Sequence, residues 1–109
     1  NGGQMIPGLN VYAHELVSLL GRDSAEALYR LAASARDRVH ARIVQHGIDC
    51  DLRPGHVHLA ARKKDMADFR READFANRLL GDGSADIIAA ADVRRHVAVD
   101  GYHGALLTP

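Results

Sequence analysis

Seven histidines make metal binding the first chemistry to consider. His56 and His58 stand two residues apart on an expected strand, so both side chains face one way, as two metal ligands would. The same positions also fit the polar face of an amphipathic strand. The sequence has no pair of cysteines and no His-x-x-x-His motif. We therefore expect no metal site, and a small metal-binding protein is kept as an alternative.

A second cluster of reactive residues lies just before these histidines. Cys50 next to an aspartate or histidine could act as a nucleophile, and Asp49 and Asp51 could do acid–base chemistry as a pair. The alternation of Ile48, Cys50 and Leu52, however, places the thiol on the apolar side of an expected strand. We therefore interpret Cys50 as a small buried side chain. The two aspartates are expected to lie on the opposite, solvent-exposed face of the strand. No catalytic residue is assigned.

Composition excludes several classes of function. Fourteen basic residues balance fourteen acidic ones, so no net field attracts nucleic acid or a membrane surface. No apolar run approaches the ~20 residues that span a bilayer. Neither Gly-x-Gly-x-x-Gly nor Gly-Lys-Ser/Thr occurs, so no phosphate-binding loop is present. The single cysteine excludes an internal disulfide and is typical of a reducing, cytoplasmic compartment.

Two long helices are the main elements that must position these residues, at Asp23 to His46 and at Lys63 to Leu80. Asp23 and Glu26 have the spacing of a capping box. Each helix has one apolar face, which in the second helix repeats at Met66, Phe69, Ala73, Ala76 and Leu80. We expect the two faces to pack together, Leu31, Ala35, Val39 and Ile43 against Phe69, Ala73, Ala76 and Leu80. Ion pairs four residues apart are expected within each helix: Glu26–Arg30 and Asp74–Arg78.

The remaining elements are short. His14 to Leu20 and Ala90 to Val97 are predicted to be helices. Residues 48–61 are predicted to form a hairpin that turns at Arg53-Pro54-Gly55. Asp86 to Ala89 is predicted to be a short strand, and Tyr102 to Leu107 a last extended segment. The expected class is therefore α+β, mostly helical, with two long helices, two short helices and a small antiparallel hairpin or sheet in at most one domain.

The order of several segments resembles a known family. Asn1-Gly2-Gly3-Gln4 followed by Ile6-Pro7-Gly8 resembles the segment after the first nucleotide-binding unit in FAD-dependent oxidoreductases of the D-amino-acid oxidase superfamily, in the gamma-glutamylputrescine oxidoreductase-like branch. Residues 46–51 resemble the helix-to-strand junction of that branch, and residues 53–60 resemble the next strand. Residues 91–97 and 102–107 resemble the later helix and strand.

This resemblance implies an internal fragment of a longer bacterial flavoenzyme that oxidises an amine or amino-acid C–N bond. Asn1, Gly2, Gly3 and Gln4 would bind the cofactor, because glycines let the backbone approach a flat ring and N–H groups stabilise its reduced form. Residues 1–10 would be the flavin-proximal loop, 11–47 a helical region, 48–61 the hairpin, and 62–109 the substrate-domain side. The chain starts at Asn1 rather than Met and ends on apolar residues, which we interpret as two cut ends.

The isolated chain is expected to bind no FAD and to be inactive, because no pyrophosphate-binding helix N-terminus with its fingerprint is present. It is also expected to form a homodimer through unpaired sheet edges and exposed apolar side chains, namely Val57, Leu59, Leu106 and Leu107. The alternative function is a free-standing helical protein-interaction module without catalysis.

Overall fold

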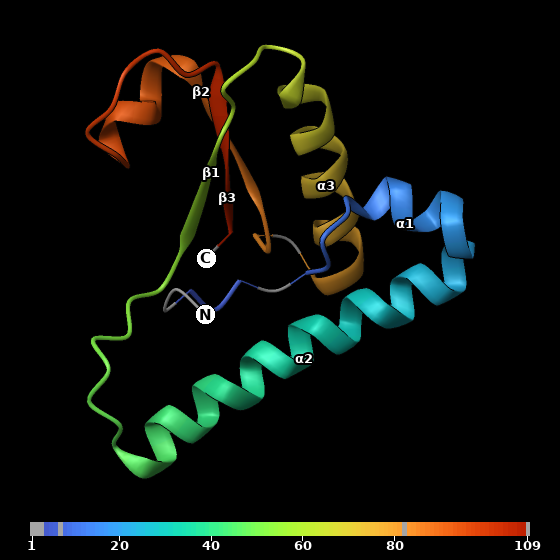
Figure 1. Cartoon of the computed structure of the whole chain (residues 1–109), viewed down its shortest axis with the longest axis vertical. Coiled ribbons are helices and arrows are strands. Elements are labelled where there is room, and N and C mark those ends of the chain that lie inside the picture. Colours follow the sequence, from blue (N-terminus) through green and yellow to red (C-terminus); the bar gives the residue numbers. More distant parts are fainter. Residues whose placement is uncertain (1–3, 7, 82, 109) are drawn as a thin grey trace. The chain divides into compact units, whose positions relative to one another are not determined.

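The computed structural model describes residues 4–6, 8–81 and 83–108 (Figure 1). Within that part of the chain the elements are α1 (Ala13–Leu20), α2 (Arg22–His46), β1 (His56–Leu59), α3 (Asp65–Leu80), β2 (Asp86–Ala89), the 3₁₀ helix η1 (Ala90–Arg95) and β3 (Gly104–Thr108). The mostly helical α+β class predicted from the sequence is confirmed. None of the described helices has the length and apolarity needed to cross a bilayer. The chain divides into two compact units, Asn1–Arg53 and Pro54–Pro109.

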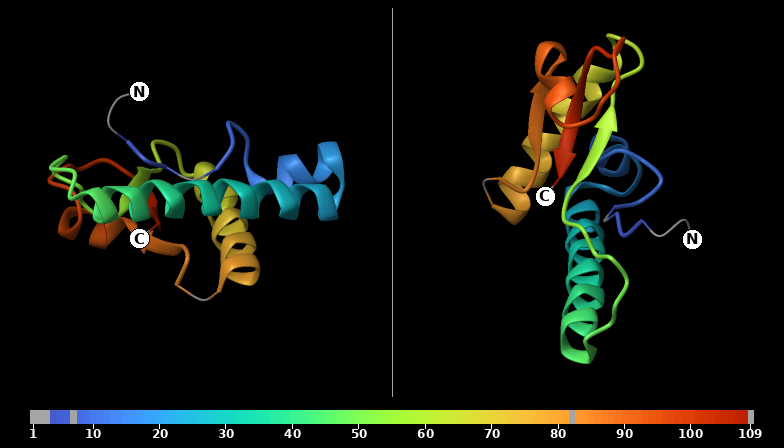
Figure 2. Two further views of the ribbon diagram at one scale, coloured as in Figure 1. Left: turned by 90° about the horizontal axis from the view of Figure 1, so that it is seen from below. Right: turned by 90° about the vertical axis from the view of Figure 1, so that its left-hand side faces the viewer.

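The first unit consists of α1, α2 and the segments around them. The backbone N–H of Tyr12 donates to Glu15 Oε2 at 3.0 Å and so closes the start of α1. Gly21, with φ +79°, separates α1 from α2. The two helices pack on each other, and the first unit's buried apolar side chains are Ala13, Leu16, Ala25 and Ala33. Figure 2 shows α2 as one continuous helix, which ends at Gly47 in the left-handed conformation.

The predicted start of α2 is wrong. The helix begins at Arg22, directly after Gly21, and no side chain caps it. Asp23 therefore lies inside the first turn, where its carboxylate is favoured by the helix dipole rather than acting as a cap. Glu26 pairs with Arg22 at 3.5 Å instead of with Arg30.

The apolar face predicted for α2 is not buried within the first unit. Leu31 is 64% exposed and Val39 is 47% exposed. The packing of this face on the second long helix stays a prediction. The buried positions, Ala25 and Ala33, lie on another side of α2, since each residue advances about 100° around a helix.

The predicted hairpin over residues 48–61 is not formed. Residues 48–55 contain no strand, and Asp51 has φ +50°, a left-handed conformation that interrupts an extended segment. Cys50 is exposed, so its interpretation as a small buried side chain is wrong as well. β1 pairs instead with β3, antiparallel, with His56 opposite Thr108 and Leu59 opposite Ala105.

The second unit is a three-layered arrangement around a small sheet. The strand order is β1-β3-β2, and both pairings are antiparallel. α3 lies on one side of the strands and η1 on the other (Figure 1). On the η1 side, the core consists of Ile88, Val93 and Ala105, with Val57, Leu59, Val97 and Leu107 packed against it. Leu106 is buried too, so the expectation that the four apolar side chains of β1 and β3 are exposed is wrong.

The buried face of α3 is largely as predicted. Met66, Phe69, Ala73 and Ala76 are buried, but Leu80 is exposed, and the buried residues at the end of the helix are Phe75 and Leu79. The helix begins at Asp65 rather than Lys63. The Asp65 carboxylate accepts the backbone N–H of Arg62 at 3.0 Å. The later elements shift by a few residues from their predicted bounds. The strand at Asp86–Ala89 is confirmed, the short helix is a 3₁₀ helix ending at Arg95, and β3 begins at Gly104.

Candidate functional site

The candidate cofactor-binding residues lie at the N-terminal end. Asn1, Gly2 and Gly3 are outside the described residues, so their predicted role beside a flavin stays a prediction. Gln4 is described: it is exposed and lies outside any helix or strand. Gly8, four residues later, has φ +127°, a conformation that L side chains rarely adopt.

His56 and His58 lie on the same side of β1, as predicted. Their ring centroids are 6.2 Å apart. The His58 ring packs against Phe69 of α3, with centroids 4.7 Å apart and the planes tilted by 44°. This distance is typical of favourable aromatic pairs. His58 thus covers the edge of the core between the sheet and α3.

The environment of His56 favours its neutral form. Burial lowers the pKa of His56 from its ordinary value of 6.5, and the neighbouring charge of His58 lowers it further. A histidine whose folded-state pKa is lowered binds protons less readily in the folded than in the unfolded protein. Its contribution to the free energy of unfolding is therefore fully present at high pH and is lost as the pH falls below the ordinary histidine pKa of 6.5.

We therefore expect the free energy of unfolding to fall between about pH 7.5 and about pH 5.5, with His56 responsible for part of the loss. Urea unfolding of the wild type and of His56→Gln at the two pH values measures this share. The variant should show the weaker pH dependence, whereas His96→Gln, at an exposed position, should keep that of the wild type. Identical pH dependence in wild type and His56→Gln would contradict the assignment.

The remaining candidates do not assemble into a reactive group. Asp51 forms an ion pair with Arg53, with Nη2 and Oδ1 2.9 Å apart, rather than an acid–base pair with Asp49. In the described part of the chain, no three His, Cys, Asp or Glu side chains are grouped so as to hold a metal ion.

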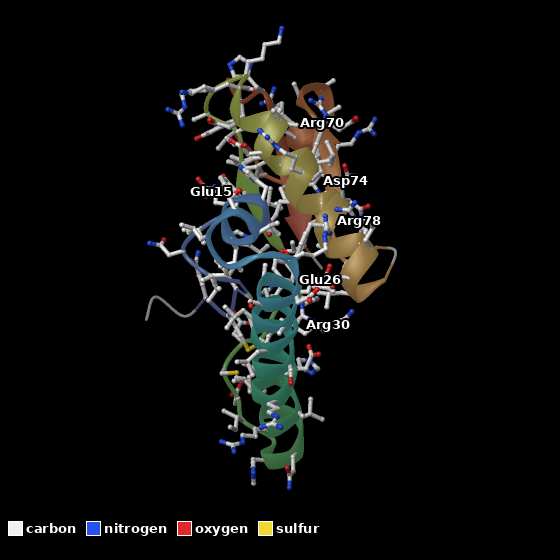
Figure 3. All side chains as sticks on the ribbon, turned by 90° about the vertical axis from the view of Figure 1, so that its right-hand side faces the viewer. Glu15, Glu26, Arg30, Arg70, Asp74 and Arg78 are labelled. Carbon is white, nitrogen blue, oxygen red and sulfur yellow. The ribbon has the colours of Figure 1, made fainter. Side chains whose placement is uncertain are left out.

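The charged side chains of α3 form a solvated face. Arg70, Asp74 and Arg78 follow one another along the helix (Figure 3). The predicted pair Asp74–Arg78 is not among the ion pairs of the described residues; Arg71 pairs with Asp68 instead, at 2.9 Å. Exposed pairs of this kind contribute little to stability.

The side-chain amide of Asn77 makes two hydrogen bonds that were not predicted from the sequence. Asn77 Nδ2 donates to Ala85 O at 2.8 Å, and Ala85 N donates to Asn77 Oδ1 at 3.0 Å. These two hydrogen bonds connect the C-terminal part of α3 to Ala85, the residue before β2. The sequence did contain one indication of this pairing. Asparagine has a low helix propensity, so an asparagine inside a predicted helix suggests that its side chain has a specific hydrogen-bond partner.

The whole chain, residues 1–109, matches the family described as FAD dependent oxidoreductase. It is 31% identical to the gamma-glutamylputrescine oxidoreductase of Escherichia coli over 98% of this chain and 25% of that protein. It is 26% identical to the probable oxidoreductase OrdL of Haemophilus influenzae over 97% of this chain and 25% of that protein. The chain thus spans about a quarter of the length of these curated relatives. No solved structure matches it significantly.

Proposed function

Because this chain belongs to the family of FAD-dependent oxidoreductases, we propose that it is a section of a longer flavoenzyme that oxidises the C–N bond of a small amine or amino acid. The observation that carries the proposal is the family match over the full 109 residues, together with relatives about four times as long. The name of the E. coli relative, gamma-glutamylputrescine oxidoreductase, supports an amine substrate. The bacterial relatives support a bacterial enzyme, for which we propose a cytoplasmic location.

The residues proposed to lie beside the cofactor are Asn1, Gly2, Gly3 and Gln4. FAD, when bound, would accept a hydride from the carbon attached to the substrate nitrogen. Gln4 suits this place because its exposed amide can both donate and accept hydrogen bonds at the edge of a polar ring. Gly8 leaves open space around its α-carbon, where a Cβ would have no atom within 4 Å. The described part of this segment is therefore compatible with close approach of a flat ligand.

For the 109-residue chain by itself, we propose neither FAD binding nor oxidase activity. Binding a dinucleotide pyrophosphate requires a helix N-terminus that follows a glycine-rich turn, and the sequence has no such fingerprint. We also propose that the isolated chain self-associates as a homodimer, because it leaves several large apolar side chains exposed.

The test compares the 109-residue chain with the longest protein encoded by its reading frame. Both are purified by gel filtration, and bound flavin is measured by its visible absorbance. The long protein should carry about one flavin per chain and should bleach when gamma-glutamylputrescine, simpler amines or amino acids are added without oxygen. The 109-residue chain should be colourless.

Each negative result has a definite meaning. A colourless long protein would contradict the flavoenzyme proposal and favour the alternative of an interaction module without catalysis. A yellow long protein that no amine or amino acid bleaches would contradict the substrate class. Stoichiometric flavin on the 109-residue chain would contradict its proposed inactivity as a cofactor binder.

A further inference from the structure

The loop that joins η1 to β3 is hydrogen-bonded near its two ends but not in its middle. The backbone N–H of Val99 donates to Val97 O at 2.8 Å, and the N–H of His103 donates to Ala60 O at 2.9 Å. Among the described residues, none accepts a hydrogen bond from the backbone N–H groups of residues 100–102, which lie between these two contacts. A segment without such bonds opens at little free-energy cost, so the middle of this loop can change its backbone torsions easily.

The middle of this loop begins with Asp100 and Gly101, an order that favours reaction of the aspartate side chain with the backbone. Gly101 has no side chain to shield its nitrogen, and a Cβ there would have no atom within 4 Å. The Asp100 side chain is 70% exposed, and its ion pair with Arg94, from Nε to Oδ1 at 3.2 Å, joins two exposed groups. Such pairs hold their partners weakly. The described part of the second unit therefore lets the Asp100 carboxyl approach the nitrogen of Gly101.

We propose that Asp100-Gly101 is a site of spontaneous covalent modification, at which Asp100 converts to isoaspartate. The Gly101 nitrogen attacks Cγ of the protonated Asp100 carboxyl. A C–N bond forms and one C–O bond breaks, and the released oxygen leaves as water with the carboxyl proton and the N–H proton. The product of this first step is a succinimide ring that contains the Gly101 nitrogen.

Water then opens the ring at one of its two carbonyl carbons. Breaking the bond between the nitrogen and Cγ restores aspartate, whereas breaking the bond between the nitrogen and the backbone carbonyl carbon gives isoaspartate. One water is lost and one is gained, so the mass of the chain is unchanged and no other reactant is consumed. In isoaspartate the backbone runs through Cβ and Cγ, so the loop that leads into β3 becomes longer by one atom.

Asp92 is a matched internal control in the same unit. Its side chain is 44% exposed and pairs with Arg95, from Oδ1 to Nη1 at 2.9 Å, much as Asp100 pairs with Arg94. The residue after Asp92, however, is Val93, whose branched side chain crowds its backbone nitrogen. Both residues also lie within η1, which fixes their backbone torsions. We therefore expect Asp92 to stay unmodified.

Incubation of the 109-residue chain at mildly acidic pH, where more of each carboxyl group is protonated, tests the proposal. Circular dichroism checks that the chain stays folded throughout the incubation. Trypsin, which cuts after arginine, then releases the proposed site in the peptide of residues 96–109 and the other Asp-Gly pair, Asp82-Gly83, in the peptide of residues 79–94. Mass spectrometry with electron-transfer fragmentation distinguishes isoaspartate from aspartate at each position.

Isoaspartate should accumulate at residue 100 and not at Asp92. The rate at residue 100 should lie within about tenfold of the rate in a synthetic peptide of residues 96–109, because a loop that opens at little cost reacts like an unfolded chain. Asp100→Glu should leave this position unmodified, since glutamate keeps the charge but would have to close a larger, more slowly formed ring. Asp82→Glu, the matched change at the other Asp-Gly pair, should leave the rate at residue 100 unchanged.

A rate at residue 100 more than about tenfold below that of the synthetic peptide would overturn the proposal, because it would mean that the folded chain holds this loop closed. Isoaspartate confined to the peptide of residues 79–94 would overturn it as well and would place the reaction elsewhere. Equally fast reaction at Asp92 would show that neither the loop nor the Asp-Gly order selects the site. The measurements are made on the 109-residue chain, so their outcome is independent of the proposed flavoenzyme function.

Discussion

Replacing Gly104 with alanine is expected to destabilise the second unit by about 3 kcal/mol or more. Gly104 is the buried first residue of β3 and has φ +137°. A Cβ there would lie 2.7 Å from the Cε and Sδ atoms of Met66 and 2.8 Å from Ile88 O. The Met66 side chain can move, but Ile88 O belongs to the backbone of β2, which is paired with β3 through Ile88 and Ala105.

Gly101→Ala is the control that separates backbone strain from the clash. Gly101 also has positive φ, +85°, but a Cβ there would meet no atom within 4 Å. Its replacement should therefore cost only the conformational strain, about 1 kcal/mol. Urea unfolding of the 109-residue chain, followed by circular dichroism, measures both variants. Equal losses would show that strain alone, and not the approach of Met66 and Ile88, requires glycine at the start of β3.

The sequence was sufficient to predict elements whose burial follows their own periodicity. Met66, Phe69, Ala73 and Ala76 repeat at helical spacing, and all four are buried in α3. The apolar face of α3 packs against the three-stranded sheet of the same unit. Local pattern and tertiary packing agree, so the prediction holds.

The pairing of strands could not be predicted in the same way. Alternation indicates that residues 56–59 form a strand, but it does not say which strand lies beside it. The nearest alternating segment, residues 48–52, is interrupted by the left-handed Asp51, and the actual partner, β3, comes more than forty residues later. Sequence proximity is a useful guide to strand pairing, and here it was misleading.

The apolar face of α2 shows a second limit. The spacing of Leu31, Ala35 and Val39 indicates correctly a helix with one side that favours burial. It does not indicate what buries that side, and Leu31 and Val39 are not buried within the first unit.

The candidate site depends on resemblance more than on spacing. No arrangement of reactive side chains in the sequence indicated a flavin, and Asn1 to Gln4 came from likeness to a family. The family match supports that likeness, while the individual roles of the four residues stay predictions. Spacing did place His56 and His58 on one side of β1, but only the fold shows that His58 packs on Phe69.

Replacing Phe69 with alanine is expected to cost about 3–5 kcal/mol, the range for a large aromatic side chain in a core. Phe69 is 1% exposed and lies between α3 and the sheet. Leu80→Ala on the same helix, at a position 37% exposed, should cost less than about 1 kcal/mol. Urea unfolding compares the two variants, and proton NMR adds a local measurement. The ring protons of His58 should move toward unfolded values in Phe69→Ala, because they lose the ring 4.7 Å away, whereas those of the exposed His96 should not move. Equal costs for the two variants, with unchanged His58 resonances, would mean that the core between α3 and the sheet is not centred on Phe69.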